Sequence, residues 1–335
     1  MPRYARSVAS RARAVELVAR WPAARPTFEA IGWLVSAVGI ASFASYVISE
    51  TARTGGIGYD LQSYLLAGRH ALSGADLYAP VNIGDPGAYR YTPTFAVLAA
   101  PAALLPELAV TWAYRFVCLL CVRYLVGSWR AVGWSLLFQP LAIELMALNL
   151  TLPIAALGRL ALRSPSRWAG WLAFAGSLKY GSALLMPYLW LRRPESRRVL
   201  LFGTGAVVLL SLVHFAIDPG VWLRFAAALA QQARSANTAP FVGDQLLTLL
   251  PSTVGDFLLR LGLASVMVAV AVWRRWDWLA FTAATLAVPT LWLARLAPLV
   301  AVPRLWWEDR QVREVLLDTR ADVPRPRPSP AEAGG

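Results

Sequence analysis

Charged side chains are scarce in this chain of 335 residues. Asp, Glu, Lys and Arg together make up 15% of it, whereas hydrophobic residues make up 57%. The mean hydropathy is +0.50. A soluble globular domain normally carries about 25% charged residues. The composition therefore excludes an ordinary soluble domain and indicates a polytopic membrane protein, for which the bilayer acts as the solvent.

Cysteine and histidine are also rare, with two residues of each kind. Cys118 and Cys121 lie about one helical turn apart in an apolar run without a second cysteine pair, and His70 and His214 are isolated. Zinc sites need several such ligands at short spacings, and disulfide frameworks need more cysteines. No acidic cluster suggests another metal. We therefore expect neither a metal site nor a cofactor.

Lysine occurs only once. Of the 32 basic residues, Lys179 is the single lysine, which leaves 31 arginines and a net charge of +13. The arginines cluster between apolar runs instead of forming one basic stripe, so no nucleic-acid partner is expected. Clusters at 163–167, 192–198 and 274–276 instead mark cytoplasmic loops, because such loops carry an excess of positive charge.

Apolar runs long enough to cross a bilayer are frequent. They predict an all-α integral membrane protein, a multi-pass helical bundle of about ten transmembrane segments. Residues 28–307 form this membrane domain. Residues 1–27 are expected to be an arginine-rich cytoplasmic tail without the apolar core of a signal peptide, and 308–335 a disordered cytoplasmic tail. The runs fall near 28–49, 92–106, 108–127, 131–148, 150–162, 168–191, 199–217, 254–273, 278–294 and 296–307.

Two long polar connections then face outward, across a plasma membrane with both termini in the cytoplasm. They extend from Glu50 to Tyr91 and from Asp218 to Val254. Each contains the pattern of an amphipathic interfacial helix, LQSYLLAGRHAL in the first and VWLRFAAALAQQA in the second.

The run 168–191 has arginine clusters at both ends, which the charge rule places on the same side of the membrane. A re-entrant arch with SLKYG (177–181) at its tip satisfies the rule. Alternatively, the segment 149–162 is irregular and the count of spans changes by one.

Asp60 and Lys179 are the first candidates for chemistry. Asp60 follows the glycine-rich stretch GGIGY and opens the first outward segment, where it is either a general base or only the N-cap of a helix. Lys179 lies inside an apolar run, where a lysine costs about 2.5–3.5 kcal/mol on insertion scales. It either binds an anionic lipid phosphate or extends to the membrane surface.

Other polar residues interrupt the apolar runs. The aromatic residues that open the stretch from Tyr89 to Pro106 are typical of an interfacial belt. Arg115 and Arg123 are typical of arginines whose side chains extend to the membrane surface, and Glu144 and Asn149 of interhelical hydrogen bonds. Alternatively, these four residues belong to a functional site.

A series of short motifs follows in a fixed order along the chain. The series comprises DLQSYLLAGRHALSGADLY (60–78), with Asp60 and Tyr64; YRYTPTFAVLAAPAALLP (89–106), with Arg90 and Tyr91; Asn149 in MALNLTLP; Lys179 in SLKYGSALLMPYLWLRR; and Trp222 followed by Asp244 and Gln245 of GDQLL. In this series the chain resembles the polyprenol-phosphate-mannose-dependent α-mannosyltransferases of bacteria, glycosyltransferase family 87 of the glycosyltransferase-C superfamily.

The resemblance implies a glycosyltransferase-C-like fold and an inverting transfer of a mannosyl or other hexosyl unit. The donor would be a polyprenyl-phosphate sugar, the acceptor a lipid-linked glycan or glycolipid on the outer face of the membrane, and Asp60 the general base. A second carboxylate is not needed, because a phosphate leaving group needs no general acid. The residues implied to bind substrate are Lys179, Tyr64, Arg90, Tyr91, Asn149, Asp244, Gln245 and Arg295.

The chain departs from the family pattern at two places. Met146 and Ala147 replace the Gly-Gln that precedes the retained Asn149, and Ala294 stands where the family has a histidine. Arg295 follows one position later, rotated by about 100° on an α-helix. Two alternatives stay open: a transporter or flippase for an anionic lipid or solute, and a non-catalytic homologue.

Overall fold

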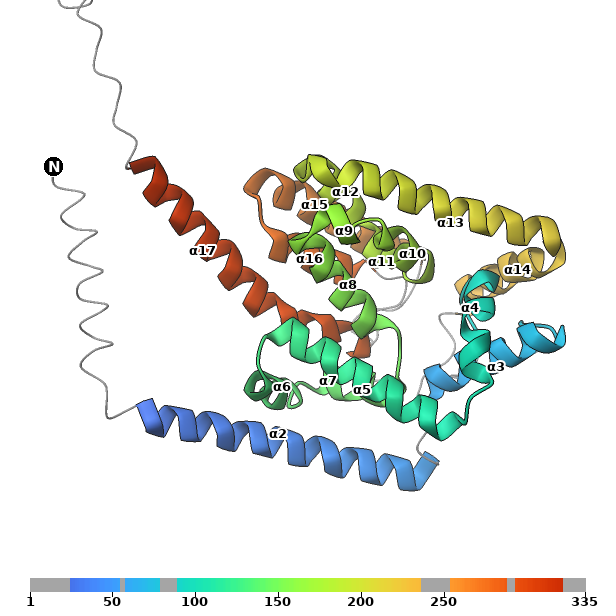
Figure 1. Ribbon diagram of the computed structural model, residues 1–335, viewed down its shortest axis with the longest axis horizontal. Helices are drawn as coiled ribbons and strands as arrows, with labels where there is room; N and C mark the ends of the chain where they lie inside the picture. The colour runs from blue at the N-terminus through green and yellow to red at the C-terminus, as the bar shows by residue number, and fades with distance from the viewer. Residues whose placement is uncertain (1–24, 55–57, 79–88, 236–253, 288–292, 322–335) are drawn as a thin grey trace, which may run out of the picture.

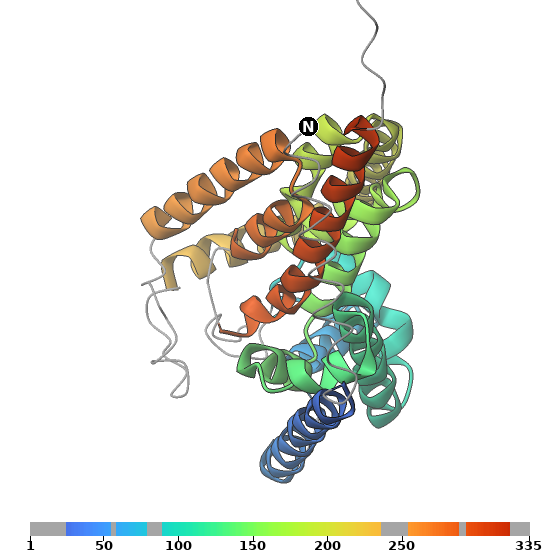
Figure 2. The same cartoon turned by 90° about the vertical axis from the view of Figure 1, so that its left-hand side faces the viewer.

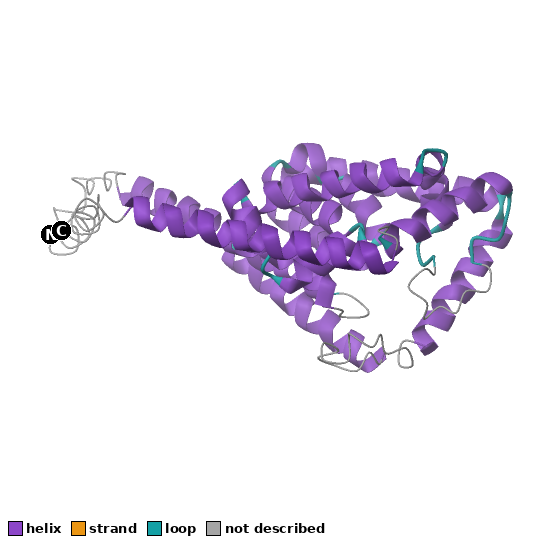
Figure 3. Cartoon of the chain, turned by 90° about the horizontal axis from the view of Figure 1, so that it is seen from below, coloured by secondary structure: helices purple, strands orange, loops and turns teal. Residues whose placement is uncertain are grey.

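The computed structural model describes residues 25–54, 58–78, 89–235, 254–287 and 293–321. Within these ranges every regular element is a helix and none is a strand (Figure 3). The predicted all-α class is therefore confirmed. In chain order the helices are α2 (Arg25–Thr54), α3 (Tyr59–Ser73), α4 (Pro93–Ala103), α5 (Glu107–Val126), α6 (Trp129–Ser135), α7 (Gln139–Ala147), α8 (Thr151–Arg163), α9 (Pro165–Trp168), α10 (Trp171–Leu178), α11 (Tyr180–Ala183), α12 (Leu185–Arg192), η1 (Pro194–Ser196), α13 (Arg197–Ile217), α14 (Pro219–Ser235), α15 (Val254–Arg274), α16 (Asp277–Leu286), η2 (Leu293–Ala301) and α17 (Val302–Ala321).

Three of the described helices are long and apolar enough to cross a membrane. They are Glu29–Ser49 within α2, Glu107–Val126, which is α5, and Pro194–Ile217, which is η1 with α13. The pair α7 and α8 passes the same test together, although it bends by 111°. Large apolar side chains such as Phe202 and Leu34 are exposed on these helices, at 78% and 65%, and a bilayer would cover them. These features indicate a membrane protein.

The run 168–191 folds as an arch instead of one straight helix. It is divided into α10, α11 and α12, and Lys179 lies at the break between α10 and α11. At the base of the arch α9 contacts η1, so residues 165–168 and 194–196 lie side by side. The two ends of the arch therefore meet, as the charge pattern predicted, with Lys179 at its tip.

The two predicted amphipathic segments are helices, α3 and α14, and they lie close together at one end of the bundle (Figure 1). Arg224 of α14 pairs with Asp76 after α3 at 3.1 Å, and the ring of Phe225 packs on Tyr78. Arg193, from one of the arginine clusters, instead contacts Asp277 at the start of α16.

Helix α17 is attached to the bundle by a carboxylate shared among arginines. Glu308 pairs with Arg159 of α8 at 2.8 Å, with Arg304 at 3.1 Å and also with Arg163. Arg159 is nearly fully buried, so its charge depends on this partner. Since α17 extends to Ala321, the boundary predicted at residue 307 falls inside a helix. Residues 1–24 and 322–335 lie outside the described residues.

Helix α2 lies along one edge of the molecule (Figure 2) and packs chiefly on α6. Ser36 of α2 is buried in this contact, and the indole N–H of Trp134 donates to the Gly32 carbonyl oxygen at 2.6 Å. The interior has two apolar clusters. The larger one joins helices from α5 to α17, and the smaller one joins α3 and α4 to Leu148 at the end of α7.

Candidate functional site

The site is built around the corner between α7 and α8. Helix α7 ends at Ala147, Leu148 has a left-handed backbone (φ 56°, ψ 47°), and α8 begins at Thr151. This conformation costs a non-glycine residue roughly 1–2 kcal/mol. Broken helices leave backbone polar groups without helical partners, so inside a membrane protein they occur where the backbone is buried in protein or lines a water-filled cavity. Glu144, Asn149 and Thr151 place buried polar side chains around the corner.

Asn149 connects the corner to Asp60. Its amide nitrogen Nδ2 donates to Asp60 Oδ2 at 2.5 Å, while its oxygen Oδ1 accepts from the hydroxyls of Tyr64 at 3.2 Å and Tyr91 at 3.4 Å. The two tyrosine hydroxyls lie 2.9 Å apart. Four residues that the sequence placed on three separate motifs therefore form one hydrogen-bonded group.

A glycine makes this contact between α3 and α7 close. A Cβ added to Gly58 would lie 2.6 Å from the backbone oxygen of Ala147 and 2.7 Å from that of Met146. Real Cβ atoms do not approach backbone this closely, so any other residue would force α3 away from α7. Gly58 is therefore what allows Asp60, two residues later, to reach Asn149.

The predicted alternative that Asp60 caps a helix is wrong. Gly58 occupies the N-cap of α3, no side chain caps this end, and Asp60 lies in the first turn. Its carboxylate turns toward Asn149 instead. The hydrogen bond from Asn149 reaches one carboxylate oxygen, Oδ2.

Burial raises the pKa of Asp60 above its usual value, against the charge of Arg295, the hydrogen bond from Asn149 and the charge of Arg90. A carboxylate with a raised pKa is a stronger base. Burial, followed by the charge of Asp60, also raises the pKa of Tyr91 to about 12. The Tyr91 hydroxyl therefore keeps its proton and acts as a hydrogen-bond donor.

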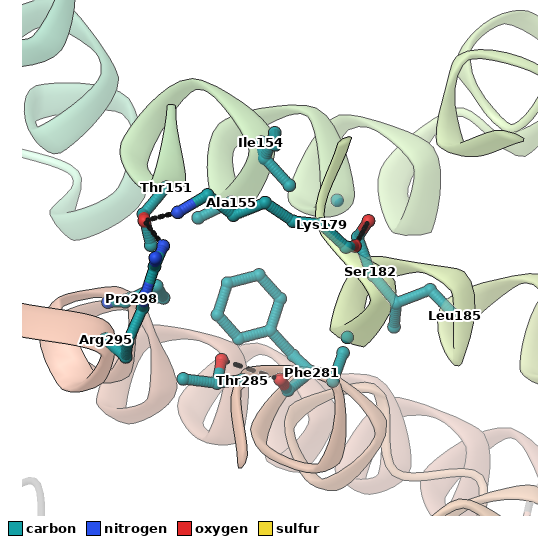
Figure 4. A pocket seen from close by; sticks show the side chains of 13 residues that line it. Thr151, Ile154, Ala155, Lys179, Ser182, Leu185, Phe281, Thr285, Arg295 and Pro298 are labelled. Atoms are coloured by element: carbon teal, nitrogen blue, oxygen red, sulfur yellow. Dashed lines mark hydrogen bonds between the residues drawn. The ribbon is translucent and has the colours of Figure 1, made fainter. Parts of the chain in front are cut away.

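Two cations meet on the other side of the corner. Lys179 Nζ donates to Thr151 Oγ1 at 2.8 Å, and Arg295 Nη1 donates to the same oxygen at 3.2 Å (Figure 4). The lysine side chain thus points inward, contrary to the alternative in which it extends to the membrane surface. No acid pairs with Lys179 among the residues that the structure describes. The ammonium therefore has no counter-ion at contact distance there.

A cavity of about 50 Å³ lies beneath these cations. Lys179 and Arg295 reach its rim from different elements, the tip of the arch and η2, and the ring of Phe281 forms part of its wall (Figure 4). Its lining is apolar apart from a few hydroxyl and cationic groups. The polar lining residues are Thr151, Lys179, Ser182, Thr285 and Arg295, and the apolar ones include Ile154, Ala155, Leu185, Phe281 and Pro298.

Arg295 reaches the site although it lies one position after Ala294, where the resemblance predicts a histidine. The segment Leu293–Ala301 is a 3₁₀-helix, which turns about 120° per residue instead of 100°. Burial lowers the pKa of Arg295, but Tyr91, Glu144 and Asp60 more than offset this, and the pKa ends above its usual value. The guanidinium therefore stays charged between the base and the cavity.

The structure brings together most of the predicted site residues. Asp60, Tyr64, Tyr91 and Asn149 form the acid half, Lys179 and Arg295 form the cationic half, and the charge of Arg90 acts on Asp60. Asp244 and Gln245 lie outside the described residues.

Sequence reasoning missed Thr151 and undervalued Glu144. The Thr151 hydroxyl oxygen accepts a hydrogen bond from each of the two cations, and Glu144 is a buried acid, 1% exposed, in the last turn of α7. The sequence carries no signal that singles out Thr151, which is the first residue of α8 and does not cap the helix. Tyr114 also belongs to the site, since its hydroxyl donates to the Asn149 carbonyl oxygen at 3.0 Å.

No group of three or more His, Cys, Asp or Glu residues is placed to hold a metal ion within the described ranges. No family model, curated protein or solved structure matches the chain. The site contains one carboxylate, Asp60, on one side of the corner 149–151 and two cations, Lys179 and Arg295, on the other side. Such a pair of features suits the transfer of a group from an anionic leaving group to a hydroxyl.

Proposed function

We propose that this protein is an integral-membrane glycosyltransferase with a glycosyltransferase-C-like bundle of about ten spans. It transfers a mannosyl or other hexosyl unit, with inversion, from a polyprenyl-phosphate sugar to a lipid-linked glycan or glycolipid. The reaction takes place at the outer face of a bacterial plasma membrane, and both termini lie in the cytoplasm. The observation that carries the proposal is the corner 149–151, which contacts Asp60 on one side and Lys179 with Arg295 on the other.

In the reaction, Asp60 Oδ1 accepts the proton of the acceptor hydroxyl while that oxygen forms a bond to the anomeric carbon of the sugar. The bond from this carbon to the phosphate oxygen breaks, and the electron pair leaves with the polyprenyl phosphate. Lys179 and Arg295 stabilise the charge that develops on the phosphate, an effect worth about 10²–10³ in rate for one such donor. The start of α8 adds the positive end of its dipole.

The remaining residues of the site orient this reaction. Asn149 fixes the Asp60 carboxylate through Oδ2, and Tyr64 and Tyr91 fix the amide of Asn149. The charge of Arg295, the hydrogen bond from Asn149 and the charge of Arg90 favour the ionised form of Asp60 against burial. Asp244 and Gln245 are proposed to contact the substrate on the basis of the motif alone.

The test is incubation of the purified protein with a radiolabelled polyprenyl-phosphate mannose and a membrane lipid extract. We expect a new labelled glycolipid from the wild type and none from Asp60→Asn. This substitution keeps an oxygen that can accept from Asn149 Nδ2, so the fold should be retained, which circular dichroism and size-exclusion chromatography check. Full activity in Asp60→Asn would end the assignment of the base.

A transporter would use Lys179 and Arg295 for an anionic substrate in the same way. It would move a labelled polyprenyl-phosphate sugar across the bilayer of a proteoliposome without forming a new covalent product. A non-catalytic homologue would do neither. Either outcome would overturn the glycosyltransferase proposal.

A further inference from the structure

Four arginines stack on the rings of exposed tryptophans. A guanidinium within about 6 Å of a ring centroid is attracted by the aromatic face, and in these pairs the guanidinium carbon lies 4.2–5.9 Å from the centroid. None of the four arginines forms an ion pair with an acid in the ranges that the structure describes. The pairs are Arg123 with Trp129, Arg130 with Trp134, Arg197 with Trp190, and Arg274 with Trp273.

The four pairs lie at one end of the bundle, where several helices begin or end. Helix α17 contacts two of these helices there, because Arg304 donates to the Tyr124 carbonyl oxygen near the end of α5, and α17 also packs on α16. At the start of α16, directly after α15, Asp277 contacts Arg193 between α12 and α13. Helix α13 then extends from this end across the molecule to α14 (Figure 1).

At the opposite end of the bundle, two arginines form ion pairs instead. Arg69 of α3 pairs with Glu107 at 3.2 Å, and Arg224 of α14 pairs with Asp76 at 3.1 Å. An acid neutralises the charge of a guanidinium, whereas an aromatic ring attracts the cation without carrying a net charge. The arginines stacked on tryptophans therefore keep their positive charge, and a negatively charged partner fits that end of the bundle.

The tryptophans of the four pairs are exposed, from 38% for Trp190 to 72% for Trp273. Indole rings favour the boundary between hydrocarbon and water, at the level of the lipid headgroups. A guanidinium that stacks on such a ring lies at the same level. Its N–H groups lie in its own plane and match two oxygens of a phosphate. The pairs thus combine an anchor at the bilayer boundary with a donor for a headgroup phosphate.

We propose that the four pairs form a binding surface for the headgroups of anionic phospholipids, the arginine–tryptophan surface. A zwitterionic headgroup carries a cation that the arginines repel, whereas an anionic headgroup is attracted to positive charge at the membrane surface. The exposed rings favour a lipid over a soluble acidic partner, because a bilayer also covers their apolar area. The inference does not rest on the proposed function, since the surface shares no residue with the candidate site.

The test measures which lipids contact the tryptophans. The purified full chain is reconstituted in vesicles of phosphatidylcholine or phosphatidylglycerol whose acyl chains carry bromine, which quenches tryptophan fluorescence on contact. Mixtures of brominated and unbrominated lipids give the binding constant of phosphatidylglycerol relative to phosphatidylcholine. One arginine near an anionic membrane surface strengthens binding about fivefold, so the wild type should prefer phosphatidylglycerol by about fivefold or more.

Paired substitutions locate this preference. Arg197 and Arg274 are exposed, so Arg197→Gln with Arg274→Gln removes two charges of the surface at little cost to the fold and should lower the preference about fivefold. Arg197→Lys with Arg274→Lys keeps both charges and should retain most of the preference. Arg69→Gln with Arg224→Gln is the matched control, since it removes the same charge at the opposite end and should leave the preference unchanged.

Salt gives a second measurement that needs no variant. Raising the salt concentration from about 0.1 M to about 1 M shortens the Debye length from about 10 Å to about 3 Å and should weaken the preference of the wild type. Equal quenching by both lipids in the wild type would overturn the inference, and so would an equal loss in the control pair or an unchanged preference in the glutamine pair. If circular dichroism shows that the glutamine pair does not fold, the two single variants and the salt series decide in the same way.

Discussion

Replacement of Asn149 by leucine should change the pH at which the proposed base becomes active. The hydrogen bond from Asn149 Nδ2 to Asp60 Oδ2 at 2.5 Å favours the ionised carboxylate. A hydrogen bond to a charged group is worth about 1.5–3 kcal/mol, and one pKa unit corresponds to about 1.4 kcal/mol. Its loss should therefore raise the pKa of Asp60 by about one to two units beyond the effect of burial. Leucine has a similar size, so the corner should keep its shape.

The assay is the pH dependence of kcat/KM for sugar transfer. Because a base acts in its deprotonated form, the acidic limb of the profile should move to higher pH by about one to two units in Asn149→Leu. The melting temperature should drop more at pH 8 than at pH 4, since only the ionised Asp60 loses its partner. In an Asp60→Asn background this pH dependence should disappear. An unmoved acidic limb would refute the coupling between Asn149 and Asp60.

The remaining predictions concern separate parts of the molecule. Asp60→Asn should raise the melting temperature at pH 7, because the raised pKa of Asp60 makes its ionised form a cost as the pH rises, and the gain should vanish below about pH 4. Lys179→Met should lower kcat/KM for the donor about a hundredfold without loss of helix content, and an unchanged kcat/KM would exclude the phosphate contact. Gly58→Ala should reduce transfer about a hundredfold by displacing α3. Its control, Gly205→Ala, adds a Cβ that meets nothing within 4 Å and should keep full activity. Burial raises the pKa of Glu308, but its three arginines hold it below the usual range. Glu308→Gln should therefore lower the melting temperature at neutral pH, with a smaller penalty as the pH falls, as thermal unfolding would measure.

Much of the helical framework could be predicted from composition and periodicity. The amphipathic helices α3 and α14 follow from their patterns, and the arch with Lys179 at its tip follows from arginine clusters at both ends of one apolar run. These features depend on local sequence, on the length of a run or on the sign of charge beside it. All of them can be read along the chain.

The corner could not be predicted in the same way. The apolar runs 131–148 and 150–162 resemble two ordinary spans, whereas the structure has a bend of 111° between α7 and α8. The bend depends on the left-handed backbone of Leu148, which no sequence pattern demands of a leucine. Thr151 and Glu144 enter the site only through this bend. Hydropathy describes how much of a segment is apolar, but not where its axis turns.

The position of Arg295 was hard to predict for a related reason. The expected rotation of about 100° per residue holds for an α-helix, whereas the segment is a 3₁₀-helix. The N-cap alternative for Asp60 failed because Gly58 takes that position. In both cases a shift of one or two positions along the helix changes the direction in which a charged side chain points.

The corner 149–151 has a mechanical consequence for the chemistry. Since neighbouring residues of one short peptide are bonded to the acid on one side and to both cations on the other, any motion of that peptide carries the two halves of the site along together. The distance between the Asp60 carboxylate and the two cations is therefore set by three consecutive residues of the backbone and does not depend on how the outer helices pack.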